Sequence, residues 1–170
     1  MIKSLIFHLV NCDCWRRRSR SPKRSTWGYS TDPSGSERVD AIDFQTNGDV
    51  ILAGYRLWGV SSGSTSFQVT IRLYRGNNLI AEKTGSYATS SSVKTFEVHF
   101  SQVISIRAGV TYTATARIVT SKYSFAHNDG LASASCSGVT VTFKTSSKNS
   151  NGSNRSYGQI PALIFLSSQC

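Results

Sequence analysis

Strict alternation of apolar and polar side chains runs through residues 67–74 and restricts the fold classes that are compatible with this sequence. Phe67, Val69, Ile71 and Leu73 each follow or precede a more polar neighbour. A period of two puts every second side chain on the same face of an extended strand. One face then packs on a core and the other meets solvent, which is typical of an antiparallel sheet.

Similar short segments recur along most of the chain, with turn residues between them. Gly76-Asn77-Asn78 tolerate positive φ and predict a hairpin, and Pro161, which has no N–H to donate, must lie at the start of the last strand or at a bulge. The expected strands cover residues 39–44, 50–60, 67–73, 79–83, 96–100, 103–107, 111–118, 139–143 and 159–166. The pattern predicts an all-β fold: one antiparallel β-sandwich, jelly-roll-like, of about eight to eleven strands.

Positive charge is concentrated at the N-terminal end. The chain has 170 residues and a formal net charge of +10, and residues 1–26 carry seven Lys or Arg against one Asp. We therefore divide it into a basic arm, residues 1–26, expected to be disordered, and a sandwich domain, residues 27–170. The arm fits a nuclear signal, an RNA contact, a membrane-surface anchor or a solvated linker. Nucleic-acid binding is expected only through its Arg16–Arg24 segment.

Neither export nor membrane insertion is expected. Residues 1–10 resemble a secretion signal, but His8 interrupts the apolar stretch and no small-residue cleavage site follows. No apolar run reaches the roughly 18 residues that cross a bilayer. The glycosylation triplets at Asn151 and Asn154 are therefore interpreted as loop residues.

No set of residues suggests catalysis, a metal or a cofactor. His99 alternates with apolar neighbours and should face solvent, whereas His127 lies in a polar loop without a nucleophile nearby. Asp40 and Asp43 should project from opposite faces of a strand. Cys12 and Cys14 lack the histidine or cysteine partners that a zinc site needs.

Several blocks of residues follow one another in a characteristic order. They are Trp27-Gly28-Tyr29-Ser30, Asp40–Phe44 with Val50–Gly59, Phe67–Leu73, Phe96–Phe100 with Val103, Gly109–Ala116, and Asn151-Gly152-Ser153 ahead of Gly158–Phe165. Together these blocks resemble the PHR domain, which is named for the Pam/Highwire family. The likeness covers residues 27–170 and departs from the family's pattern in the polar Lys122–Gly130 loop.

The resemblance implies a non-catalytic protein-interaction module of E3 ubiquitin ligases. Such modules occur in large neuronal RING-type ligases, including those like Myc-binding protein 2, and in BTB-domain adaptors for cullin ligases. The Ser-rich basic arm favours the large ligase. The expected partners are proteins of the ubiquitin-ligase pathway and the substrates or regulators that they recruit. We expect a monomer in the cytoplasm, with the nucleus as a second location, and an axonal or synaptic site for a large neuronal ligase.

Loops at one end of the sandwich are the expected binding surface, because a rigid core can hold them with little ordering cost. Gly54, Gly59 and Gly158 are expected to be structural, since each lies in or beside a strand. The candidate contact residues are Trp27, Tyr29, Asp40, Tyr55, Trp58, Tyr123, Phe125, His127 and Asp129.

Three other functions stay open on the sequence alone. A carbohydrate-binding sandwich would use Trp58 and the loop tyrosines as a stacking platform. A nucleic-acid binder would use the basic arm, and its affinity would fall steeply with salt. A hydrolase would use His127, although no nucleophile accompanies it.

Overall fold

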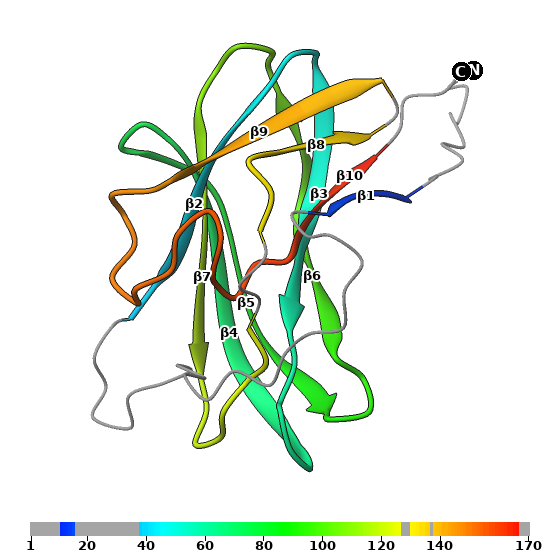
Figure 1. Ribbon diagram of the computed structural model, residues 1–170, viewed down its shortest axis with the longest axis vertical. Coiled ribbons are helices and arrows are strands. Elements are labelled where there is room, and N and C mark those ends of the chain that lie inside the picture. The colour runs from blue at the N-terminus through cyan, green and yellow to red at the C-terminus, as the bar shows by residue number, and fades with distance from the viewer. Residues whose placement is uncertain (1–10, 16–37, 127–129, 137, 167–170) are drawn as a thin grey trace, which may run out of the picture.

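A computed structural model describes residues 11–15, 38–126, 130–136 and 138–166 (Figure 1). This part of the chain forms ten strands, all paired antiparallel. It contains no helix of the length and apolarity that a membrane span requires. The strands are β1 Asn11–Trp15, β2 Asp40–Thr46, β3 Val50–Trp58, β4 Ser64–Arg75, β5 Asn78–Ser90, β6 Thr95–Ile106, β7 Tyr112–Val119, β8 Ser133–Cys136, β9 Val139–Thr145 and β10 Ala162–Leu166.

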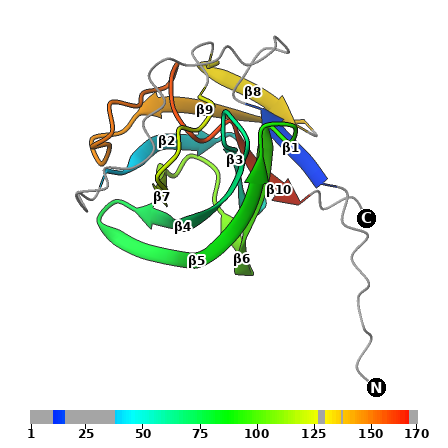
Figure 2. The same cartoon turned by 90° about the horizontal axis from the view of Figure 1, so that it is seen from below.

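The strands form two sheets that pack face to face, so the predicted β-sandwich is confirmed. The larger sheet has six strands in the order β5-β4-β7-β2-β9-β8. The smaller has the order β10-β3-β6, with β1 added at the β10 edge. Seen along the strands, the larger sheet curves around the smaller one (Figure 2).

Aromatic side chains join the two sheets across the core. Phe44 of β2 meets Phe165 of β10 with ring centroids 6.3 Å apart, and Phe67 of β4 meets Phe96 of β6 at 6.0 Å. Aliphatic residues fill the space between these pairs, as the alternation of β4 predicts: Val69, Ile71 and Leu73 are fully buried. Such edge-to-face pairs add to the stability that burial alone provides.

The predicted hairpin at Gly76 is confirmed, and its strands are longer than expected. Arg75 pairs with Asn78 across a two-residue turn, in which Gly76 has a φ of 60°. β4 and β5 then stay paired to the far end of both strands, where Ser64 lies opposite Ser90. The ends of β4 and β5 that lie away from the Gly76 turn are rich in Ser and Thr. Backbone pairing therefore makes both strands longer than the apolar pattern predicts.

The expected break between two strands near residue 101 is wrong. Residues 95–106 form one strand, β6, whose register with β3 shifts between Leu52 and Gly54. The same irregularity changes the inward face of β3. Strict alternation along residues 50–60 would put Tyr55 on the face of Ile51 and Ala53, but Tyr55 packs in the core with Leu52. An irregularity of this kind moves subsequent side chains to the other face.

Two short strands are not among those expected from the sequence. β8 is a Ser- and Ala-rich edge strand that pairs with β9. β1 lies inside the segment expected to be a disordered arm, yet residues 11–15 pair with β10. The structure describes no other residue of that segment, so the division at residue 27 stays a prediction. Both strands do alternate polar with small or apolar residues, but only over four or five positions, which is too short a pattern to predict a strand.

Candidate partner-binding surface

Three loops meet at one end of the sandwich, the lower end in Figure 1. Residues 59–63 connect β3 to β4, residues 91–94 connect β5 to β6, and residues 120–126 follow β7. We call this surface the loop end. It brings together segments that lie far apart in the sequence but next to one another at the ends of packed strands.

Backbone hydrogen bonds tie the three loops together through Gly59. The Gly59 N–H donates to the Lys94 carbonyl oxygen at 2.8 Å, and the Gly59 carbonyl accepts from the Phe125 N–H at 2.8 Å. The Ser61 N–H donates to the Tyr123 carbonyl oxygen at 2.9 Å. A side chain at residue 59 would overlap the Thr89 hydroxyl and lie 2.9 Å from the Val93 carbonyl oxygen. The close approach of the loops therefore requires glycine here.

Gln159 holds the 120–126 loop from the core side. Its side-chain amide donates to the Ser124 hydroxyl and, at 2.9 Å, to the Phe125 carbonyl oxygen. Its own main-chain carbonyl accepts from the Trp58 N–H at 3.2 Å. Gln159 is only 3% exposed, so these bonds form away from water and rigidify the loop. From the sequence, Gln159 is recognised only as part of the Gly-Gln-Ile-Pro motif. Its position as a polar residue next to the apolar run that forms β10 was the one hint of a buried structural role.

The loop end presents apolar and basic side chains to solvent. Val93 is 56% exposed and Tyr123 is 69% exposed. Each has an exposed lysine beside it in the chain, Lys94 and Lys122, and the Lys122 ammonium donates to the Ser64 carbonyl oxygen at 3.0 Å. The described residues of the three loops include no Asp or Glu. Of these four residues, sequence reasoning identified only Tyr123 as a candidate contact.

Three other candidates lie inside the protein. Tyr55 and Trp58 are fully buried, and Phe125 is 8% exposed. The Tyr55 hydroxyl donates to the Arg72 carbonyl oxygen at 2.9 Å, and burial raises its pKa well above the usual value. Trp58 packs beside Phe125 with ring centroids 6.5 Å apart, under the loop. Assigning Tyr55 and Trp58 to a contact surface is therefore wrong, because no partner reaches a side chain without exposed area.

Asp40 is also buried, and it stabilises the long polar segment ahead of β10. Its carboxylate accepts from the Asn151 side-chain amide at 2.8 Å, and the Ala41 N–H donates to the Ser153 hydroxyl at 3.3 Å. A Cβ on Gly158, whose φ is +151°, would lie 2.9 Å from the Ser153 Cβ. Asp40 therefore acts in folding, and the Asn151 side chain is engaged in the fold instead of presenting a free glycosylation site.

The remaining four candidates, Trp27, Tyr29, His127 and Asp129, lie outside the described residues. His99 faces solvent as predicted: its side chain is 47% exposed, and its Nε2 lies 2.9 Å from Glu97. The Arg56 guanidinium, 2.5 Å from Glu97, holds the pKa of that carboxyl below its usual value, and His99 adds to the effect. Arg56, Glu97 and His99 lie together on the outer face of the smaller sheet.

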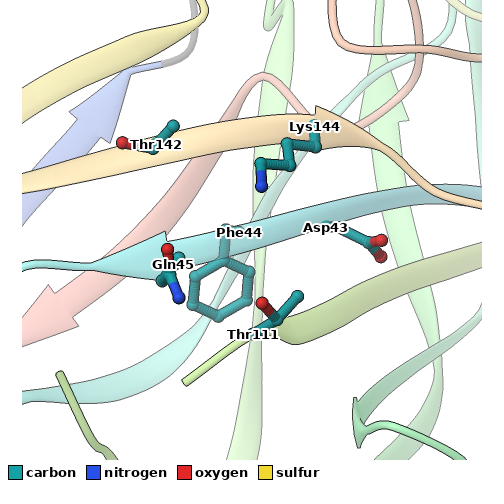
Figure 3. Close-up of a pocket in the computed structure, with 6 residues that line it drawn as sticks. All are labelled: Asp43, Phe44, Gln45, Thr111, Thr142 and Lys144. Carbon is teal, nitrogen blue, oxygen red and sulfur yellow. The ribbon is translucent and has the colours of Figure 1, made fainter. Parts of the chain in front are cut away.

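A hollow on the larger sheet offers little to a ligand (Figure 3). Its empty space of about 160 Å³ is small beside the roughly 300 Å³ or more of common ligand sites. Asp43 at its rim already accepts a hydrogen bond from the Thr113 hydroxyl at 2.7 Å. Within the described ranges, no three His, Cys, Asp or Glu side chains gather as metal ligands. The hollow is lined by Asp43, Phe44, Gln45, Thr111, Thr142 and Lys144.

Comparison with known proteins places the chain in a family. The PHR domain pattern matches residues 17–166. Human BTB/POZ domain-containing protein 3 is 32% identical over 157 residues, which is 92% of this chain and 29% of that protein. Human BTB/POZ domain-containing protein 6 is 32% identical over 152 residues, 89% of this chain and 27% of that protein.

Zebrafish (Danio rerio) BTB/POZ domain-containing protein 6-A matches equally well, at 32% identity over 152 residues. The chain thus spans less than a third of the length of these relatives. The PHR domain is a non-catalytic module. With the family pattern covering most of its length, this chain belongs to the PHR domain family.

Proposed function

We propose that this PHR domain recruits proteins to a cullin-type ubiquitin ligase as the substrate-binding part of a BTB adaptor, and that it does so through the loop end. The observation that carries the proposal is the exposure of Val93 and Tyr123 on loops that backbone bonds hold in place. Large exposed apolar side chains on a rigid frame are typical of protein-binding surfaces.

The relatives favour a BTB adaptor over a large RING-type ligase as the parent protein. The matched proteins are BTB/POZ domain-containing proteins, and the matched part is just over a quarter of each. The rest of such a parent would supply the link to the ligase, while this domain supplies recognition. The adaptor would work in the cytoplasm, with the nucleus as a second location.

The test compares two valines with the same exposure. Val93 at the loop end is 56% exposed, and Val103 on β6 is 57% exposed. The full chain and its Val93→Asp and Val103→Asp variants are used to capture proteins from cells, with thermal melting to verify that each variant folds. We expect Val93→Asp, and Tyr123→Ala in parallel, to lose most of the captured proteins, while Val103→Asp retains them.

Ubiquitination then separates an adaptor from a simple binder. Fused to the BTB part of a relative, the chain should increase ubiquitination of the captured protein, and Val93→Asp should remove the increase. Equal capture by all variants would overturn the role of the loop end. Capture without any effect on ubiquitination would overturn the adaptor role. A captured set that consists of glycoproteins and is released by free sugar would favour the carbohydrate-binding alternative.

A further inference from the structure

We infer that the loop end takes an acidic peptide segment, in which large apolar side chains stand between Asp or Glu residues. The inference rests on the proposed function and adds the chemistry of the partner. Exposed apolar area, local charge and the engagement of the carboxylates in the described residues each support it.

The apolar half of the recognition surface comes from two sides of one loop. Val93 and Tyr123 belong to loops that bond to Gly59 and Ser61 from either side, through Lys94 and Tyr123 backbone atoms. Val119, which is 42% exposed, directly precedes the 120–126 loop. Half of the six exposed large hydrophobic residues in the described part therefore lie at or beside this end. The other three are Leu79, Ile80 and Val103.

The charge of the same surface is positive. Lys94 and Lys122 flank the apolar residues in the chain, and the described parts of the three loops hold no carboxylate. The Lys122 ammonium donates to the Ser64 carbonyl oxygen, and the Lys122 side chain is exposed, so its charge acts at the surface. A partner that carries Asp or Glu at this position gains Coulomb attraction, whereas a basic partner is repelled.

The carboxylates in the described ranges 38–126, 130–136 and 138–166 have hydrogen-bond partners of their own. In residues 38–166 the described part has twelve Lys or Arg and five Asp or Glu. All five acidic side chains accept a hydrogen bond from elsewhere in the domain. The pairs are Asp40 with Asn151, Asp43 with Thr113, Asp49 with the Ala108 N–H, Glu82 with Arg72, and Glu97 with Arg56.

The frame under this surface is set before a partner arrives. Gln159 and the Gly59 bonds fix the backbone of the 120–126 loop, so a segment that binds there does not have to order it. Apolar contact with Val93 and Tyr123 would provide affinity. The two lysines would provide orientation and a faster, salt-dependent association.

The experiment starts from an unbiased probe. A phage-displayed library of random 12-residue peptides is selected against the 170-residue chain, and the recovered peptides are sequenced and synthesised. We expect enrichment of Asp and Glu next to Leu, Ile, Phe or Trp. Affinity is then measured by fluorescence anisotropy at low and high salt. Replacing the apolar residues of a selected peptide by Ser should weaken binding as much as replacing its acids by Asn or Gln.

A matched pair of variants separates the site from net charge. Lys94→Glu with Lys122→Glu should weaken binding of the selected peptide about tenfold or more, since each reversal adds a repulsion at the site. Arg75→Glu with Lys144→Glu makes the same change of net charge at exposed positions away from the loop end and should have little effect. Thermal melting verifies that both variants are folded.

Several results would overturn the inference. These are selected peptides without acidic enrichment, equal weakening by both charge variants, or a 12-nucleotide single strand that binds more tightly with the same dependence on Lys94 and Lys122. Failure to select any peptide overturns it as well. The proposed function fails separately: it falls when protein capture does not depend on Val93, whatever the peptides show.

Discussion

The Tyr55 hydroxyl reaches across the core from the smaller sheet to the Arg72 carbonyl oxygen of the larger sheet, at 2.9 Å. The phenol ring is fully buried and packs edge-on against Phe100, with ring centroids 5.3 Å apart. One buried polar atom thus links the two sheets through the middle of an apolar core. Buried hydroxyl groups stay in such positions only when they have a partner.

Tyr55→Phe should lower the free energy of unfolding by about 1 kcal/mol, because it removes this hydrogen bond and leaves the ring in place. Urea unfolding followed by fluorescence measures the change. Tyr123→Phe is the control, since Tyr123 is 69% exposed and its hydroxyl can bond to water in both states. Equal stability of the Tyr55→Phe protein and the unmodified chain would contradict the structural role of the bond.

The same residue predicts how stability changes at alkaline pH. Burial raises the pKa of Tyr55, so the folded chain keeps the phenolic proton at a pH where the unfolded chain, with a pKa of about 10, loses it. The contribution of protonated Tyr55 to the free energy of unfolding is therefore fully present below the unfolded pKa and is lost as pH rises through the folded pKa. Unfolding measured between about pH 9 and 11 should show this loss, and Tyr55→Phe should reduce its slope.

Gly54→Ala should lower the free energy of unfolding by about 3 kcal/mol, and Gly54→Glu should prevent folding. A Cβ at Gly54 would overlap the Val98 carbonyl oxygen and lie 2.8 Å from the His99 Cα, both of which belong to the backbone of β6. Gly109→Ala is the control: its φ is +74°, but nothing lies within 4 Å, so strain alone should cost about 1 kcal/mol. Soluble expression and thermal melting report both effects.

The Arg56–Glu97 pair predicts part of the acid dependence of stability. Arg56 lowers the pKa of Glu97, so the unfolded state binds the proton more readily than the folded state. The contribution of the Arg56–Glu97 pair to stability is present above the pKa of Glu in the unfolded chain, about 4.3, and is lost as pH falls through the folded pKa of Glu97. Glu97→Gln should flatten the decrease of stability in acid, and Arg56→Met should do much the same. The double variant should change the acid dependence by less than the sum of the two single changes, because both residues share the Arg56–Glu97 interaction.

Gln159→Leu should loosen the loop end more than it affects the rest of the sandwich. The variant loses the bonds to Ser124 and to the Phe125 carbonyl oxygen, so the Phe125 amide should exchange with deuterium about tenfold faster or more. Gln45→Leu is the control, because the Gln45 amide bonds to the Gly109 carbonyl oxygen in a different turn. Unchanged exchange at Phe125 would mean that Gln159 does not position the loop.

Local sequence signals were sufficient for most of the strands. The alternation of Phe67, Val69, Ile71 and Leu73 and the Gly76 turn specify β4 and its hairpin without reference to any distant residue. The placement of Pro161 just before β10 is equally local, since proline has no N–H to contribute to a ladder. These features depend on neighbours in the chain, which is why sequence patterns report them.

The candidate surface was less accessible to sequence reasoning. Tyr55 and Trp58 are aromatic residues near a strand end, and by residue type alone they cannot be distinguished from Tyr123, which is exposed. The shift of register between β3 and β6 turns Tyr55 into the core, and the 120–126 loop covers Trp58. Val93 and Lys94 carry no signal of their own in a polar loop.

The sequence by itself determined that this chain forms antiparallel strands and where most of them lie, because period-two patterns and turn residues act over a few positions. Its ordered motif blocks also carried the resemblance to a PHR domain. Only the tertiary structure decided which aromatic side chains are buried and which loops share one end. Those outcomes depend on contacts between residues far apart in the chain, such as Gly59 with Phe125, 66 positions apart, and Asp40 with Asn151, 111 positions apart. Such contacts form only when both sheets have packed.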